Sequence, residues 1–168
     1  MTALSFASEL LVDTMQSGKL HKFEIVPTDD EVAQLVERFK FISVEDCRAE
    51  VAIKKVARDC WDVKGTLWAT VTQSCVVTGA PLLESVDFAI EERYVREQED
   101  SETVEVSLDG VEPLKNGAID IGELVTQSLA LAVTAWPRSD DASESYQLGE
   151  VADDHPFASL SILKNSKN

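Results

Sequence analysis

The sequence is poor in histidine and in grouped glycine. It contains two histidines, His21 and His155, and seven glycines that occur singly. Neither histidine is accompanied by a serine or cysteine in a nucleophile elbow. No glycines are grouped into a phosphate-binding loop. The sequence therefore predicts no catalytic residue, no nucleotide cofactor and no small-molecule substrate.

Cysteine is scarce as well. Cys47, Cys60 and Cys75 are widely spaced and form no CxxC pair. A disulfide framework needs paired cysteines in an exported chain, and a zinc site needs about four ligands. The three thiols are predicted to be free, with no metal bound, and Cys75 to be a small buried residue at the end of a strand.

Long apolar runs and a cationic start are both missing. The first twenty residues include Glu9 and Asp13, which argues against a secretory signal. No stretch approaches the roughly 20 apolar residues of a membrane helix. These absences predict a cytoplasmic protein with no membrane partner.

Positive charge is the largest deficit. The chain has 31 acidic and 15 basic residues, for a net charge of -16. From Glu84 to Glu112 there are eleven acidic and two basic residues, and from Asp140 to Asp154 six acidic and none basic. Such a surface repels nucleic-acid phosphates at long range. We expect a nearly neutral body with acidic arms.

Carboxylates in the first arm match no EF-hand spacing, so a solvated acidic face is the simpler interpretation than a calcium site. They are nevertheless suited to a basic partner protein, because complementary charges favour association. The candidate partner-binding residues are Glu97, Glu99, Asp100, Glu102 and Glu105.

With 168 residues, of which 44% are apolar, the chain can bury one core. Alternating apolar residues around a turn at 16–18 predict a β-hairpin over residues 9–26. Thr28 and Glu31 form a capping-box pattern, which predicts a helix over 29–40.

Strict two-residue alternation from Trp61 to Thr72 predicts a half-buried strand. Extended runs near Val51 and after the turn at 79–81 predict neighbouring antiparallel strands. A second helix is expected after Asp120 and to end at Pro137. The predicted fold class is α+β: an antiparallel sheet packed with two main helices, with barrel-like closure left open.

The predicted organisation is one domain over residues 1–137. Its residues 97–117 are charged and interrupted by glycine and proline, and we expect a mobile acidic excursion there. Residues 138–156 are expected to be a flexible acidic linker. The apolar pattern in 157–168 predicts a short C-terminal docking segment.

Basic and aromatic residues are grouped in the predicted central strands. The candidate RNA contacts are Lys54, Lys55, Arg58, Lys64 and Trp68. Such a grouping is typical of an RNA-contacting sheet face. Asp59 and Asp62 reduce the net positive charge of this group. The alternative interpretation is an ordinary solvated strand surface over core tryptophans.

Several segments together resemble the YceD family, the large ribosomal RNA subunit accumulation proteins, in their alphaproteobacterial form. The quoted segments are the helix from Thr28 to Phe39, the run from Gln73 to Pro81, the run from Gly117 to Arg138, and the terminal Pro156-Phe157-Ala158-x-Leu160. The motif residues within them are Cys75, Pro81, Asp120, Gly122 and Glu123.

The resemblance implies a non-enzymatic bacterial factor that supports accumulation of 23S rRNA and biogenesis of the large ribosomal subunit. Its partner would be rRNA, a basic ribosomal protein, or both. Many relatives carry a second cysteine where this chain has Thr78, so no metal site is transferred from them. The alternative is a thiol- or metal-dependent enzyme that uses Cys75 with nearby carboxylates.

Overall fold

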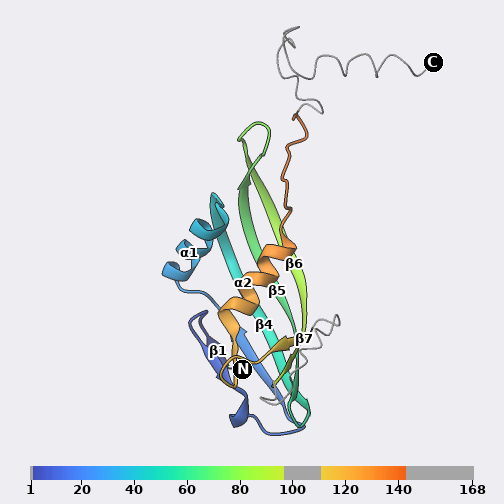
Figure 1. Cartoon of the computed structure of the whole chain (residues 1–168). Helices are drawn as coiled ribbons and strands as arrows, with labels where there is room; N and C mark the ends of the chain where they lie inside the picture. Colours follow the sequence, from blue (N-terminus) through green and yellow to red (C-terminus); the bar gives the residue numbers. More distant parts are fainter. Residues whose placement is uncertain (1, 97–110, 143–168) are drawn as a thin grey trace, which may run out of the picture.

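The computed structural model describes residues 2–96 and 111–142 (Figure 1). The strands are β1 (Thr2–Leu4), β2 (Glu9–Leu11), β3 (Leu20–Ile25), β4 (Ser43–Ala57), β5 (Cys60–Ser74), β6 (Pro81–Val95), β7 (Val111–Pro113) and β8 (Ala118–Asp120). The helices are the short 3-10 turn η1 (Val12–Thr14), α1 (Asp29–Phe39) and α2 (Ile121–Ala132). No helix within these two ranges is long and apolar enough to cross a bilayer.

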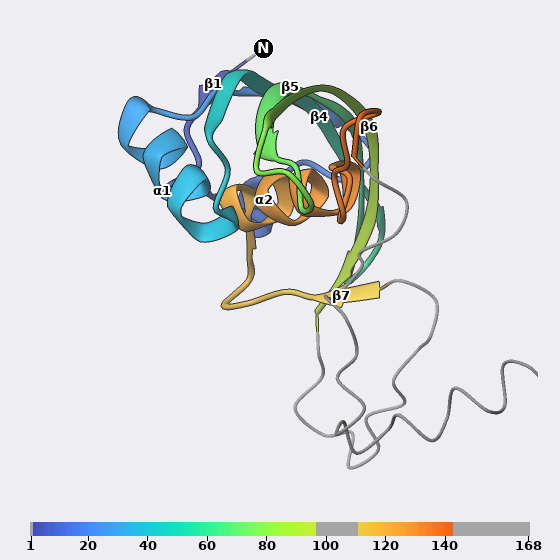
Figure 2. The ribbon, with the colours of Figure 1, turned by 90° about the horizontal axis from the view of Figure 1, so that it is seen from above.

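Six strands form a mixed sheet in the order β1-β3-β4-β5-β6-β7, and β2 pairs with β8 in a second sheet. The strands β3, β4, β5 and β6 are antiparallel, while β1 and β7 join the edges in parallel. Figure 2 shows the strands curving around α2, with α1 beside it. The α+β class is confirmed, and the sheet remains open instead of closing into a barrel.

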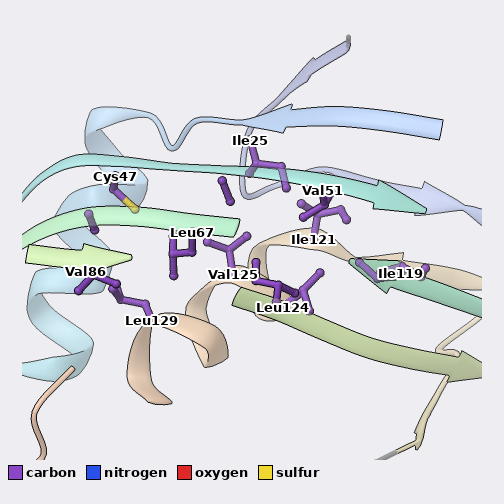
Figure 3. Close-up of a cluster of buried hydrophobic side chains, with 14 of the residues drawn as sticks. Ile25, Cys47, Val51, Leu67, Val86, Ile119, Ile121, Leu124, Val125 and Leu129 are labelled. Carbon is purple, nitrogen blue, oxygen red and sulfur yellow. The ribbon is translucent and has the colours of Figure 1, made fainter. Parts of the chain in front are cut away.

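The core lies between the concave face of the sheet and α2. Alternation along β5 turns Trp61, Val63 and Leu67 inward, and all three are fully buried. The inner side of α2 supplies Val125 and Leu129, also fully buried (Figure 3). The two-residue alternation predicted from the sequence therefore puts the apolar side chains on the face of the sheet that packs against α2.

A close backbone approach stabilises the middle of the sheet. Gly65 in β5 faces the carbonyl of Glu50 in β4, and a Cβ at Gly65 would lie 2.2 Å from that oxygen. Only glycine fits there without displacing β4, which fixes how tightly the two long strands pack.

The capping box of α1 is present as predicted. Thr28 Oγ1 accepts a hydrogen bond from the Glu31 N–H, and the Glu31 carboxylate accepts one from the Thr28 N–H. The same carboxylate also accepts from the Ala7 N–H at 2.7 Å. Hydrogen bonds from these backbone groups lower the pKa of Glu31 despite the opposing effect of its burial. Glu31 therefore joins α1 to the N-terminal segment.

The second helix is confirmed, but it ends at Ala132 and not near Pro137. Thr134 donates from its N–H and its hydroxyl to the carboxylate of Glu84 on β6. These bonds favour an extended chain after Val133, because Glu84 lies on the sheet and not along the helix axis.

The hairpin predicted over residues 9–26 is wrong. β2 pairs with β8, and β3 pairs with β1 and β4. The residues between them turn into the core: Val12 is fully buried in η1, and its N–H donates to the Gly117 carbonyl. Burial of Val12 and Met15 separates the two strands, which a tight turn would have kept together.

Part of the excursion predicted over 97–117 lies within the described residues. Residues 111–113 form β7, and Lys115 bridges to Ala118 through a turn at Asn116 and Gly117. Pairing with the end of β6 orders this charged stretch, which local composition does not reveal. Residues 97–110 lie outside the described residues. So does all of the predicted linker and docking segment beyond residue 142.

Candidate interaction surfaces

The predicted RNA-contacting residues do not share one face. Lys54 lies opposite Asp62 in the register of β4 and β5, so it is on the outer face of the sheet. Lys55 lies opposite Trp61, on the inner face, where its ammonium is 5.0 Å from the Trp61 ring. Arg58 lies in the turn between the strands. The structure therefore brings together only part of the group.

The remaining two candidates are on the outer face but have partners. Lys64 forms an ion pair with Glu91 of β6. Trp68 is half-buried, with the guanidinium of Arg48 4.9 Å from its ring. Sequence reasoning missed Arg48, because only the strand register shows that it faces Trp68.

A second ion pair lies on the outer face of the sheet. Arg93 binds Asp62 through two hydrogen bonds of 2.7 and 3.2 Å. The hydrogen bond from Arg93 is the main cause that lowers the pKa of the Asp62 carboxyl. Lys64 and Arg93 on this face are thus paired with acidic neighbours, which leaves less positive charge to attract phosphates.

A shallow hollow of about 240 Å³ lies beside Trp68 on the outer face. Lys22, Glu50, Ala52, Lys64 and Gly65 contribute to its lining. The surface is hollowed here because Ala52 has a small side chain and Gly65 has none. The charges around it are of both signs.

Cys75 lies at the tip of the β5–β6 hairpin and is 3% exposed. Its sulfur accepts hydrogen bonds from the N–H groups of Thr78 and Ser139, each at 3.4 Å. Hydrogen bonds from the Thr78 hydroxyl first, and then from these N–H groups, lower the pKa of the thiol to about 6. Burial, by contrast, raises the pKa of Cys47 to about 11. Residue 75 is therefore a buried thiol in a polar environment, and its functional role stays a prediction.

The other motif residues hold the fold together. Pro81 starts β6 opposite Ser74. Asp120 caps α2 by accepting from the Glu123 N–H at 2.9 Å. Gly122 packs against the backbone of Phe6.

Glu123 connects the two helices. It accepts hydrogen bonds of 3.0 and 3.2 Å from Arg38 of α1, which the sequence did not single out. The bond from Arg38 is the main cause that lowers the pKa of the Glu123 carboxyl. A hollow of about 380 Å³ lies between Phe6, α1 and the start of α2.

The acidic candidates Glu97, Glu99, Asp100, Glu102 and Glu105 lie outside the described residues. Acidic side chains are also present on β6, which directly precedes them: Asp87 and Glu91 on the outer face and Glu84 and Glu92 on the inner face. Burial and the nearby Glu112 of β7 raise the pKa of Glu92. Within the described ranges, no three His, Cys, Asp or Glu side chains lie close enough together to hold a metal ion.

A known family matches the chain. The family model described as large ribosomal RNA subunit accumulation protein YceD covers residues 63–164, from the middle of the sheet through the second helix and beyond. No curated protein and no solved structure matches the chain. The family description implies a role in accumulation of the large-subunit ribosomal RNA. The chain belongs to the YceD family of large ribosomal RNA subunit accumulation proteins.

Proposed function

We propose that this protein supports accumulation of 23S rRNA, and thereby biogenesis of the large ribosomal subunit, as a non-enzymatic factor that binds a basic ribosomal protein. It screens the positive charge of that protein until the protein meets rRNA. The single observation that carries the choice of partner is the arrangement of charge around β6. Its acidic strand leads into the acidic residues at 97–105, while the nearby basic side chains are paired.

Direct binding of rRNA is less compatible with this arrangement. A protein that neutralises phosphates needs lysine and arginine side chains that point to one surface. Here Lys54 and Lys55 point to opposite faces, and Lys64 already neutralises Glu91. A net charge of -16 adds long-range repulsion between the chain and RNA.

The test compares two variants with the same change in net charge. In the first, Glu97, Glu99, Asp100, Glu102 and Glu105 are replaced by the corresponding amides. In the control, five acidic residues elsewhere are replaced by glutamine: Glu9, Glu24, Glu37, Glu45 and Glu50. Each variant, and the unmodified protein, is mixed with purified basic large-subunit proteins and, separately, with 23S rRNA fragments at several salt concentrations.

We expect the first variant to lose most of its capture of a basic ribosomal protein and the control to keep it. Salt should weaken capture by the unmodified protein, because exposed charges are screened over about 8 Å at physiological ionic strength. Equal capture by both variants would contradict the proposal. So would binding of rRNA that disappears when Lys54, Lys55, Arg58 and Lys64 are reversed in charge.

A further inference from the structure

Among the described residues, one edge of the strand β6 is unpaired along most of its length. One side is hydrogen-bonded to β5 from Pro81 to Val95. On the other side β7 pairs only with Arg93 to Val95. Within residues 2–96 and 111–142, no backbone group is hydrogen-bonded to that side of Ser85–Glu92. Every second residue of this stretch therefore presents a free N–H and C=O, which is a template for an added strand.

We infer that the edge Ser85–Glu92 binds an extended basic segment of a partner protein by strand addition. This inference rests on the proposed function and specifies where and how the basic partner binds. Eight residues at about 3.4 Å each give a contact of about 27 Å, enough for several backbone hydrogen bonds.

Charge at this edge selects a basic segment. Ser85–Glu92 contains Asp87, Glu91 and Glu92 and no basic residue, and of these carboxylates Glu91 is paired with Lys64 of β5. Asp87 is exposed on the outer face, four residues from Glu91. Directly opposed like charges destabilise paired strands, whereas opposite charges stabilise them. A second copy of this chain, or its own acidic residues 97–110, would bring acidic groups against acidic groups.

The inner end of the edge also favours a cation. Burial raises the pKa of Glu92, and repulsion from the nearby carboxylate of Glu112 raises it further. Burial is also the main cause that raises the pKa of Tyr94, which lines a small hollow of about 50 Å³ with Glu112. An ammonium or guanidinium group placed between Glu92 and Glu112 would relieve the repulsion between the two carboxylates, in addition to Lys115, which lines the hollow beside Glu112.

The helix beside the edge offers apolar contact. Leu124 and Gln127 of α2 line the same hollow as Tyr94. Leu131 lies four residues after Gln127 and seven after Leu124, so it is on the same face of α2. Its side chain is 74% exposed. In Figure 2, β6 forms one side of the curved sheet and α2 fills its concave side. An added strand would thus direct one set of side chains toward Leu131 and the other set toward Asp87, since Glu91 is already paired with Lys64. The matching sequence alternates apolar and basic residues.

The test uses a peptide of about nine residues with alternating lysine and valine, which matches the length of the edge. A second peptide has the same side chains but carries an N-methyl group on every amide, so that neither of its edges can donate hydrogen bonds to β6. A third replaces lysine by glutamate. Affinity for the full chain is measured by fluorescence anisotropy, and amide hydrogen exchange is followed residue by residue along β6.

We expect the lysine peptide to bind and to slow exchange within Ser85–Glu92, and the other two peptides to bind much more weakly. Asp87→Lys should weaken binding roughly tenfold, because it turns an attraction at contact distance into a repulsion. Leu131→Gln should weaken it by a smaller factor. Glu37→Lys on α1 makes the same charge change far from β6 and should have no effect.

Equal binding of the N-methylated peptide, or unchanged exchange along β6, would overturn strand addition. Failure of this inference is distinguishable from failure of the proposed function. If Asp87→Lys captures a basic ribosomal protein as well as the unmodified chain does, the edge is not the site and the proposed function stands. If the unmodified chain captures no basic ribosomal protein, the proposed function fails, whereas slowed exchange with the lysine peptide still supports the edge as a site.

Discussion

Replacement of Gly122 by alanine tests how α2 is seated against the N-terminal segment. A Cβ at this position would lie 2.2 Å from the Phe6 carbonyl oxygen and 2.9 Å from its carbonyl carbon, whereas ordinary contact begins at 3.4 Å. The backbone of Phe6 would have to retreat by about 1 Å, since no flexible side chain can yield instead. Retreat would also stretch the bond of 3.4 Å from the Ile121 N–H to the Ser8 carbonyl.

Two effects of opposite sign compete in Gly122→Ala. Alanine is favoured over glycine inside a helix by about 1 kcal/mol. Overpacking of this kind typically costs about 1–3 kcal/mol, and a clash with backbone belongs at the upper end. We therefore expect a net loss of about 1–2 kcal/mol in the free energy of unfolding.

Urea unfolding followed by circular dichroism measures the loss. With a slope of about 2 kcal/mol per molar urea, in the middle of the usual range for small proteins, the midpoint should fall by roughly 0.5–1 M. The matched control is Ala130→Gly, at an exposed position of the same helix, which isolates the helix-propensity effect. A midpoint for Gly122→Ala that is unchanged or higher would refute the close packing of Gly122 on Phe6.

Two further predictions concern Cys75 and Thr28. The difference in ultraviolet thiolate absorbance between the protein and Cys75→Ser should titrate near pH 6; a midpoint near 8.5, the ordinary thiol value, would contradict the hydrogen bonds to the sulfur. Because the folded pKa is the lower one, the stability from this thiolate is fully present above about pH 8.5 and is lost as the pH falls through about 6. Thr28→Ala should lower the free energy of unfolding by about 1 kcal/mol, since the Glu31 N–H loses its partner; thermal unfolding that leaves the midpoint unchanged would exclude the capping role.

Local features of this protein were predictable because their partners are close in sequence. The start of α1 depends on Thr28 and a residue three positions later. The burial of Trp61 and Leu67 follows from alternation within one strand. For the same reason Asp120 could be recognised as a helix cap. The total charge and its concentration in two segments needed no structure at all.

The contacts between distant segments were decided only by the tertiary structure. Pairing of β2 with β8 joins residues 9–11 to 118–120, and no local pattern distinguishes this partner from β3. Arg38 and Glu123 are 85 residues apart, so their ion pair follows from how α1 and α2 pack. Separation of Lys54 from Lys55 is a consequence of the strand register, because adjacent residues of a strand point to opposite faces.

The sequence by itself determined that this protein is acidic, has one α+β core and carries its excess negative charge near β6 and toward the C-terminus. Only the tertiary structure decided which strand is left with an open edge, because that depends on where β7 joins the sheet and where it stops. Strand neighbours are chosen by which buried faces fit together over long sequence separations. For that reason Lys54 and Lys55 lie on opposite faces and Lys64 is paired with Glu91, while one edge of Ser85–Glu92 has no strand partner among the described residues.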